Sequence, residues 1–293
     1  MRSLVMGASG QVGRALLAST PSGVQVRGVT HADADIGDAR NVADLVADFR
    51  PSVIINAAGY TAVDRAESEA PEARRVNAEG PRNLATAALR HGARLLHVST
   101  NYVFDGQASS PYLPNAPARP LNVYGTTKLA GEQAVLETLD NRALIVRTAW
   151  IYSPLGQNFV RTMMQSMNER GSVRVVADQF GSPTSAKSLA EVLWAMALRS
   201  ELVGIYHWTD FGVANWYDFA VAIAEEGAAR RLVRGDVVVH PVATLDYPTA
   251  ARRPAYGVLD SRATSDALGI SAIHWRQRLR EALAGWSKGS IDA

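Results

Sequence analysis

The stretch Gly7-Ala-Ser-Gly10-Gln-Val-Gly13 decides the fold that we predict for this chain. It follows a short apolar segment, residues 3–6, and it precedes residues 14–19, which continue as a helix. In such a strand–turn–helix unit the first glycine permits a tight turn, the second lets a pyrophosphate approach the backbone, and the third lets the helix pack closely. The N-terminus of the helix then offers amide groups to phosphates. The sequence therefore predicts a dinucleotide site.

Further short apolar segments extend this unit into a sheet. Residues 24–29, 52–55, 94–98 and 143–149 are expected strands separated by helix-like stretches. Residues 52–55 are continuously apolar, as in a parallel sheet that is covered on both faces. We expect an α/β fold with a Rossmann-type doubly wound parallel sheet in residues 1–150, to which segments near 184–212 return. Residues 151–293 are expected to form mainly a smaller C-terminal α/β substrate-binding domain.

The composition narrows the classes of function. The 293 residues are 47% hydrophobic and 20% charged, with a net charge of +2, which is ordinary for a soluble globular protein. The chain has no cysteine, which excludes disulfides, thiol catalysis and cysteine-ligated metal. No basic run suggests nucleic acid, no apolar run approaches about 20 residues, and the first strand leaves no room for a signal peptide. We expect a cytoplasmic protein without nucleic-acid or membrane partners.

Tyr124 and Lys128 are the leading catalytic candidates. They stand four residues apart in a helical segment, so they share one face. A lysine ammonium lowers the pKa of a nearby phenol, and such a tyrosine can donate a proton to a carbonyl oxygen. Thr100 follows the strand at 94–98 and can hydrogen-bond a substrate oxygen in the same crevice. The alternatives are a solvated helix face for the pair and a local backbone contact for Thr100.

The end of the second strand bears on the choice of cofactor. Sites that prefer NAD usually carry an acidic residue there, whereas this strand runs into Thr30 and His31, with no acid before Asp33. We therefore favour NADPH, with NADH possible. Arg27 and His31 are candidate phosphate partners, unless they are surface residues without a role.

Seven segments resemble the extended short-chain dehydrogenase/reductases, and most specifically the dTDP-4-dehydrorhamnose reductase family. They are residues 7–13, 56–67, 99–106, 124–128, 147–152, 178–184 and 252–260, and they occur in the family's order over nearly the full length. Asp178-Gln-Phe-Gly-Ser-Pro-Thr184 and Arg253-Pro-Ala-Tyr-Gly-Val-Leu-Asp260 are much more specific than the glycine turn.

The resemblance implies that NADPH or NADH reduces the C4 keto group of a dTDP-4-keto-6-deoxy-hexose, most specifically dTDP-4-dehydrorhamnose to dTDP-L-rhamnose. Tyr124 would donate the proton, Lys128 would bind the nicotinamide ribose, and Thr100 would complete the triad. The expected cofactor-binding residues are Gly7, Gly10, Gln11, Val12, Gly13, Thr30, Asp35, Ile36, Ala57, Ala58, Gly59, Thr61, Ser99, Tyr124 and Lys128. The expected substrate-binding residues are Thr100, Asn101, Tyr102, Trp150, Phe159, Gln179 and Arg253. Trp150 either packs on the sugar or caps the core.

Two departures from the family pattern stand out. Asn101 replaces the usual aspartate, which removes a charge but keeps hydrogen-bonding capacity and bears on the substrate's stereochemistry. Ala15 stands where some members have a glutamate of a magnesium site at their dimer interface, so we expect no metal and either a monomer or a homodimer.

Proteins of the same fold also act as dehydratases, as other ketoreductases and as regulatory subunits. A related dehydratase would need carboxylic acids where this chain has Asn101 and Tyr102, so we do not expect dehydration. A 4-ketoreductase for another dTDP-deoxysugar in a natural-product pathway is the nearest alternative. A non-catalytic NADP-binding regulatory subunit is the alternative from a different class, and the intact Thr100, Tyr124 and Lys128 argue against it.

Overall fold

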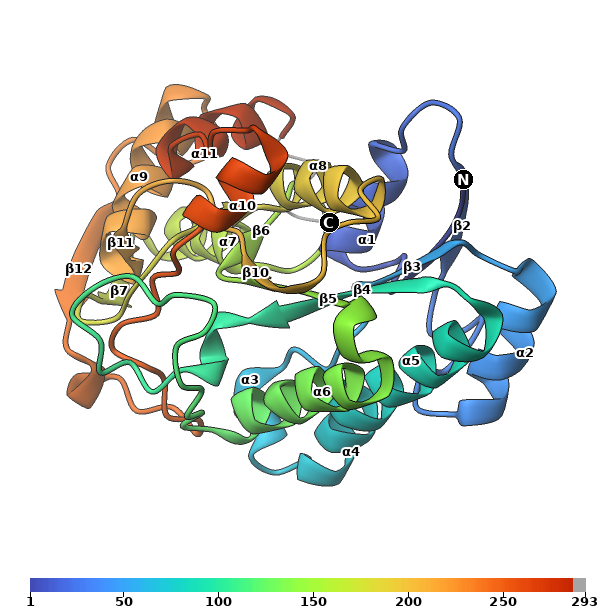
Figure 1. Cartoon of the computed structure of the whole chain (residues 1–293). Helices are drawn as coiled ribbons and strands as arrows, with labels where there is room; N and C mark the ends of the chain where they lie inside the picture. The colour runs from blue at the N-terminus through green and yellow to red at the C-terminus, as the bar shows by residue number, and fades with distance from the viewer. Residues whose placement is uncertain (287–293) are drawn as a thin grey trace.

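The computed structural model describes residues 1–286 and has a six-stranded parallel sheet at its centre (Figure 1). The strand order is β10-β5-β4-β3-β1-β2, and every neighbouring pair is parallel. The strands are β1 (Arg2–Met6), β2 (Gln25–Val29), β3 (Val53–Asn56), β4 (Arg94–Thr100), β5 (Ala143–Thr148) and β10 (Gly204–His207). Every residue of β3 and β5 is buried, as expected for strands covered on both faces. The predicted fold class is confirmed.

Helices cover both faces of the sheet. Figure 1 shows α1 (Gln11–Ala18) and α8 (Ala186–Ala197) above it, and α2 (Ala39–Phe49), α5 (Gly80–His91) and α6 (Val123–Leu139) below it. The strand order reverses at β1, which lies between β2 and β3. In open α/β sheets ligands bind outside the carboxyl ends of the strands at such a reversal. The fold therefore places a crevice where Gly7 and Ala57 follow β1 and β3.

The glycine turn depends on two of its three glycines. Gly7 has a φ of +78°, and a Cβ there would lie 2.7 Å from the amide nitrogen of Ala58. A Cβ on Gly13 would lie 2.1 Å from the carbonyl oxygen of Gly7. Larger residues would therefore separate α1 from the strand ends.

Residues 70–91 form three consecutive helical segments. These are α4 (Ala70–Arg74), a π-helical turn η1 (Arg75–Glu79) and α5. The π-turn buries Asn77, which accepts a hydrogen bond from Tyr60 N at 2.8 Å and donates to Thr127 Oγ1 at 3.2 Å. Isolated π-turns often mark functional sites. Here the turn joins the loop after β3 to helix α6.

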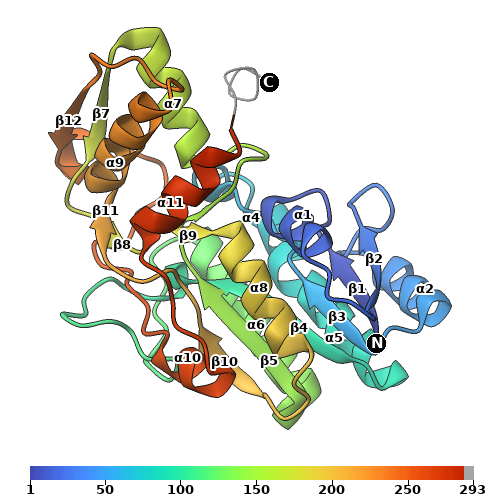
Figure 2. The same cartoon turned by 90° about the horizontal axis from the view of Figure 1, so that it is seen from above.

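A second lobe forms from the later part of the chain (Figure 2). There α7 (Phe159–Arg170), α9 (Trp216–Ala229) and α11 (Trp275–Ala284) share an apolar core with a parallel pair, β7 (Ser172–Val176) and β12 (Val238–Val242). Two-residue strands pair β6 (Ile151–Tyr152) with β9 (Thr184–Ser185), and β8 (Phe180–Gly181) with β11 (Ala214–Asn215). The remaining elements are α3 (Val63–Ala66), α10 (Arg262–Leu268) and the 3₁₀ turns η2 (Asn101–Val103), η3 (Asp140–Arg142) and η4 (Thr244–Asp246).

Candidate active site

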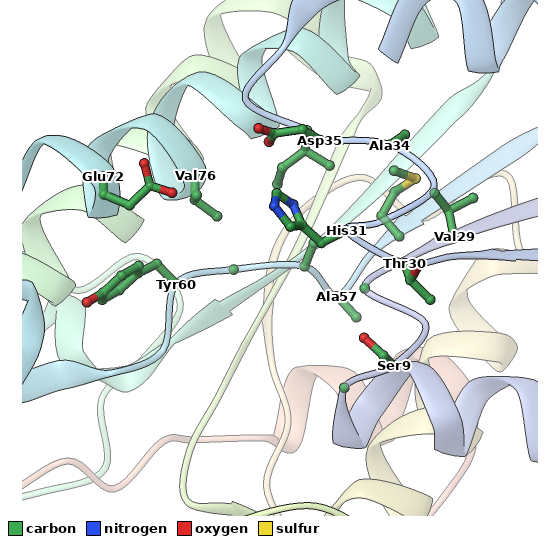
Figure 3. A pocket seen from close by; sticks show the side chains of 16 residues that line it. Ser9, Val29, Thr30, His31, Ala34, Asp35, Ala57, Tyr60, Glu72 and Val76 are labelled. Atoms are coloured by element: carbon green, nitrogen blue, oxygen red, sulfur yellow. The ribbon is translucent and has the colours of Figure 1, made fainter. Parts of the chain in front are cut away.

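A cavity of about 320 Å³, the turn cavity, lies at the carboxyl ends of β1, β2 and β3 (Figure 3). Its lining includes Gly7, Gly10, Thr30, Asp35, Ile36, Ala57, Ala58 and Gly59. Gly10 is the N-cap of α1 and has no side chain to cap the helix. The first amides of α1 are therefore free of side-chain caps and can donate to an anion.

The outer end of the turn cavity carries several ionisable groups. Thr30 donates to Asp33 Oδ2 from its amide at 2.8 Å and from its hydroxyl at 2.7 Å. Arg75 is held by Asp35 at 2.6 Å and by Glu72 at 2.8 Å. His31 projects into the cavity in Figure 3.

Arg27 is not placed as a phosphate partner. Its guanidinium pairs with Asp48 at 3.0 Å and lies over the Phe49 ring, and it lines none of the cavities described in this section. The side chain of residue 27 points to α2 because alternate residues of a strand face opposite sides of the sheet. Of the two candidate phosphate partners, His31 is the one that lies at the cavity.

The central cavity, of about 440 Å³, brings Thr100, Tyr124 and Lys128 together. Thr100 ends β4, while Tyr124 and Lys128 lie in the first turns of α6. Asn122 caps this helix by accepting from Gly125 N at 2.8 Å. A Cβ on Gly125 would lie 2.2 Å from the carbonyl oxygen of Tyr102, so glycine lets α6 approach the end of β4 closely.

Two buried hydroxyls in the central cavity lack hydrogen-bond partners. They are Ser99 Oγ and Thr148 Oγ1, at the ends of neighbouring strands β4 and β5. Buried polar groups are normally paired, so these hydroxyls fit a polar ligand lying across the strand ends. Together with the open N-terminus of α1, they make the central and turn cavities suitable for a dinucleotide.

Lys128 is buried with its ammonium group against the backbone. Its Nζ donates to the carbonyl oxygen of Val98 at 2.6 Å. Burial lowers the pKa of Lys128 to about 8, and Glu132 opposes this shift. The lysine therefore changes charge close to physiological pH.

The expectation that Lys128 lowers the pKa of Tyr124 is wrong for this structure. Burial raises the pKa of Tyr124 to about 12, a hydrogen bond with Thr100 opposes the shift, and Lys128 does not contribute to it. The ammonium group is engaged with Val98, and desolvation disfavours the phenolate. Tyr124 is consequently a protonated phenol at neutral pH, which suits a proton donor.

We predict that kcat/KM for a reduction at this site falls as the pH rises through about 8, the pKa of Lys128. Above that pH Lys128 loses its charge, whereas Tyr124 stays protonated. The measurement is the pH profile of the wild type beside that of the Lys128→Met variant. A profile of the wild type that stayed flat from pH 7 to 9 would contradict the assignment.

A third cavity, the outer cavity, measures about 410 Å³ and adjoins the central one. The two share Tyr102 and Trp216. The outer cavity is lined by Phe159, Gln179 and Arg253, and also by Asp64, Arg174 and Tyr247. Arg253 pairs with Asp64 at 2.7 Å, which joins the segment before α10 to α3. Aromatic rings beside two guanidinium groups suit a nucleotide diphosphate.

Trp150 lines the central cavity, and its ring lies between Trp216 and Gly181. It has a left-handed φ of +49°, and its ring stacks on Trp216 with centroids 3.6 Å apart and an angle of 10°. A Cβ on Gly181 would lie 2.6–2.9 Å from three ring atoms of Trp150. Strained residues of this kind cluster at functional sites, and here Trp216 and Gly181 fix the ring. A sugar would meet the edge of Trp150 more readily than a face.

Comparisons with known proteins agree with this geometry. The family profile described as "RmlD substrate binding domain" matches residues 1–287. A dTDP-4-dehydrorhamnose reductase of Aggregatibacter actinomycetemcomitans is 41% identical, with 97% of this chain and 98% of the relative covered. The chain belongs to this family.

Two further relatives bear on the RmlD-type site. The crystal structure of a dTDP-4-dehydrorhamnose reductase of Bacillus anthracis, in complex with NADP, superposes with a TM-score of 0.90 at 35% identity, covering 97% of this chain and 99% of the other. A probable dTDP-4,6-dihydroxy-2-methyloxan-3-one 4-ketoreductase of Streptomyces antibioticus is 41% identical, with 96% and 94% covered.

The structure gathers the predicted site residues of this RmlD family member around the three cavities. Each of them lines at least one cavity except Gly13, which packs beneath the turn. Within residues 1–286, no helix is long and apolar enough to cross a membrane. In the same part of the chain, no three His, Asp or Glu side chains group as a metal site.

Sequence reasoning missed several residues of the site. Asn158 donates to Gln11 Oε1 at 3.1 Å, and Trp216 supports Trp150. Asp64 holds Arg253, and Asn77 holds the loop after β3. Asn158 is the N-cap of α7, and an asparagine just before a helix is a usable sequence signal. The other three act through partners that lie far away in the sequence.

Proposed function

We propose that this protein uses NADPH or NADH to reduce the C4 keto group of dTDP-4-dehydrorhamnose, giving dTDP-L-rhamnose. The observation that carries the proposal is the meeting of Thr100, Tyr124 and Lys128 in one cavity. On one side this cavity continues along the glycine turn, and on the other it adjoins a cavity with two arginines. We further infer that the enzyme is cytoplasmic and acts as a monomer or a homodimer.

The roles of the chain's own groups follow from their surroundings. When bound, the reduced nicotinamide supplies the hydride. Tyr124 holds the proton that the new alkoxide takes, and its raised pKa keeps it protonated until then. Thr100 orients the keto oxygen, and Lys128 positions the ribose from its place beside Val98. Ser99 and Thr148 offer their unpaired hydroxyls to the same ligand.

The dTDP part of the substrate fits the outer cavity. Phe159 and Tyr247 offer ring surfaces. Within residues 1–286 Arg174 forms no salt bridge with a carboxylate, whereas Arg253 is paired with Asp64. Arginine recognises phosphate oxygens with a planar, bidentate geometry. We propose that the diphosphate binds between Arg174 and Arg253, with Gln179 beside it.

Thr30 gives a test of the cofactor preference. In the Thr30→Asp variant a carboxylate would face the 2′-phosphate of NADPH, so we expect kcat/KM with NADPH to fall more than kcat/KM with NADH. Thr30→Asn is the matched control, because it has nearly the same shape without the charge. Equal losses with both cofactors in Thr30→Asp would refute our proposal that the 2′-phosphate of NADPH lies beside Thr30.

A second candidate is a 4-ketoreductase for another dTDP-deoxysugar. Two observations favour it. The chain is similar to the Streptomyces antibioticus ketoreductase, and Asn101, which replaces the aspartate usual in the family, lines the central cavity. The chemistry at C4 would be the same, and only the sugar and its stereochemistry would differ.

The direct test is an assay of cofactor oxidation. We expect purified protein to oxidise NADPH, NADH or both when dTDP-4-dehydrorhamnose is added, and not when only dTDP is added. Oxidation that yields a C4 epimer of dTDP-L-rhamnose would favour the second candidate. Tight cofactor binding without reduction of any dTDP-4-keto sugar would exclude both.

A further inference from the structure

Asn101 has contacts that its place beside the catalytic threonine does not require. The side chain is buried, with an exposed fraction of 2%. Its Nδ2 donates to the carbonyl oxygen of Gly257 at 3.1 Å, and its Oδ1 faces Thr100 Oγ1 at 3.4 Å. One amide therefore connects the end of β4 with a segment 156 residues later in the chain.

The direction of the Asn101 amide is fixed by its partners. A backbone carbonyl can only accept, so the nitrogen must face Gly257 and the oxygen must face Thr100. Thr100 Oγ1 also accepts from Tyr102 N at 3.2 Å. Its hydroxyl proton is thus available to Asn101 Oδ1, to the oxygen of Tyr124 or to a ligand in the central cavity.

The Gly257 segment, residues 254–257, lines a small gap together with Asn101 of the central cavity and Gln179 of the outer cavity. Gly257 N donates to Phe180 O at 2.8 Å, and Phe180 N donates to Ala255 O at 2.7 Å. Phe180 follows Gln179, which lines the outer cavity. A Cβ on Gly257 would lie 2.4 Å from Asn101 Nδ2, so the glycine is needed for the two segments to approach.

We propose that Asn101 is a positioning residue that ties the Gly257 segment to Thr100, and that its amide must be neutral to do so. A carboxylate at this position would set a negative oxygen against the Gly257 carbonyl. The aspartate that is usual at this position in the family cannot donate to that carbonyl, so the tether depends on the amide of this chain. The activity readout rests on the proposed reductase function.

The surroundings make a new charge at position 101 easy to detect. Neither the central cavity nor the small gap between Asn101 and Trp216 is lined by any aspartate or glutamate within residues 1–286. The titratable groups facing this region are Tyr102 beside Asn101, Tyr124 and Lys128 from α6, and Tyr256 and Arg253 from the C-terminal segment. Burial raises the pKa of Tyr102, as it raises that of Tyr124, so both stay neutral.

The test compares Asn101→Asp with Asn101→Ala and the wild type across pH. We expect the ratio of kcat/KM for Asn101→Asp to that of the wild type to fall as the pH rises, by up to about tenfold per pH unit above the new carboxyl's pKa. Because Lys128 titrates in both proteins, its effect on the pH profile cancels in the ratio. Asn101→Ala should raise KM for the sugar nucleotide by a factor that does not depend on pH, and leave NADPH binding unchanged.

Thermal unfolding gives a second readout that needs no turnover. Burial against a carbonyl raises the carboxyl's pKa in the folded Asn101→Asp variant, so the folded state binds the proton more tightly than the unfolded state. Its Tm relative to the wild type should therefore fall as the pH rises above about 4, the unfolded value, and level off above the folded pKa. Gly257→Ala, which pushes the amide away, should reproduce the KM effect of Asn101→Ala.

The outcomes separate this inference from the proposed function. If the wild type turns over and both the activity ratio and the Tm difference are independent of pH, the positioning role of Asn101 is wrong. If the wild type reduces no dTDP-4-keto sugar, the proposed function is wrong. The pH dependence of the Tm difference between Asn101→Asp and the wild type then tests the contact between Asn101 and Gly257 by itself.

Discussion

The Tyr124→Phe variant is expected to lose about 10²–10⁴-fold in kcat, the range that general acid catalysis commonly contributes. The change removes the proton donor and leaves the ring, which contacts Tyr102 edge-on with centroids 5.5 Å apart. The binding of NADPH and the Tm should stay close to wild type. The measurement is steady-state turnover with a dTDP-4-keto sugar, together with a titration of the cofactor.

Tyr206→Phe is a suitable control for this variant, since Tyr206 lies in β10 and lines none of the cavities of the site. We expect its kcat to match the wild type. Near wild-type turnover in Tyr124→Phe, with the cofactor still bound, would remove Tyr124 from the mechanism.

The Arg147→Met variant is expected to lose about 3–5 kcal/mol of unfolding free energy, the cost of leaving a buried charge without its partner. Arg147 in β5 forms two hydrogen bonds with Glu132 in α6, at 2.6 and 2.9 Å, and both side chains are at most 4% exposed. Arg147 also donates to the carbonyl oxygen of Pro114 at 3.1 Å. The pair therefore connects helix α6 to the sheet.

Denaturant unfolding measures this loss, and two further variants interpret it. Arg82→Met breaks an ion pair between Arg82 in α5 and Glu137 in α6, the helix that also carries Glu132. The side chains of this pair are 54% and 65% exposed, so the variant should change stability little. The double variant Arg147→Met with Glu132→Leu should recover part of the loss, because no unpaired charge remains. A loss in Arg147→Met no larger than that in Arg82→Met would contradict the proposed role of the pair.

The sheet could be predicted from the sequence because its signals are local. The expected strands at 52–55 and 143–149 are apolar runs, and they correspond to β3 and β5. The glycine turn lies between β1 and α1, where the spacing of Gly7, Gly10 and Gly13 required it. The second lobe was predicted less well. Residues 172–176 form β7 only by pairing with β12, and the two-residue strands β6, β8, β9 and β11 are too short to show an alternation.

The site was predictable in its residues but not in its electrostatics. Tyr124, Lys128 and Thr100 could be proposed as catalytic residues from their identity and spacing, and they share one cavity. The pKa of Tyr124 could not be inferred in this way, because it depends on burial and on the engagement of Lys128 with Val98. The contacts of Asn101 with Gly257 and of Trp150 with Trp216 likewise arise only when distant segments meet.

The most direct test of the central claim is to follow the hydride. Reduced cofactor deuterated at C4 of the nicotinamide, on the face that is transferred, is incubated with the protein and dTDP-4-dehydrorhamnose, and the product is examined by NMR and mass spectrometry. The account predicts dTDP-L-rhamnose with deuterium at C4 of the sugar. Reduced cofactor consumed without deuterium at that carbon, or a substrate recovered unchanged, would contradict it.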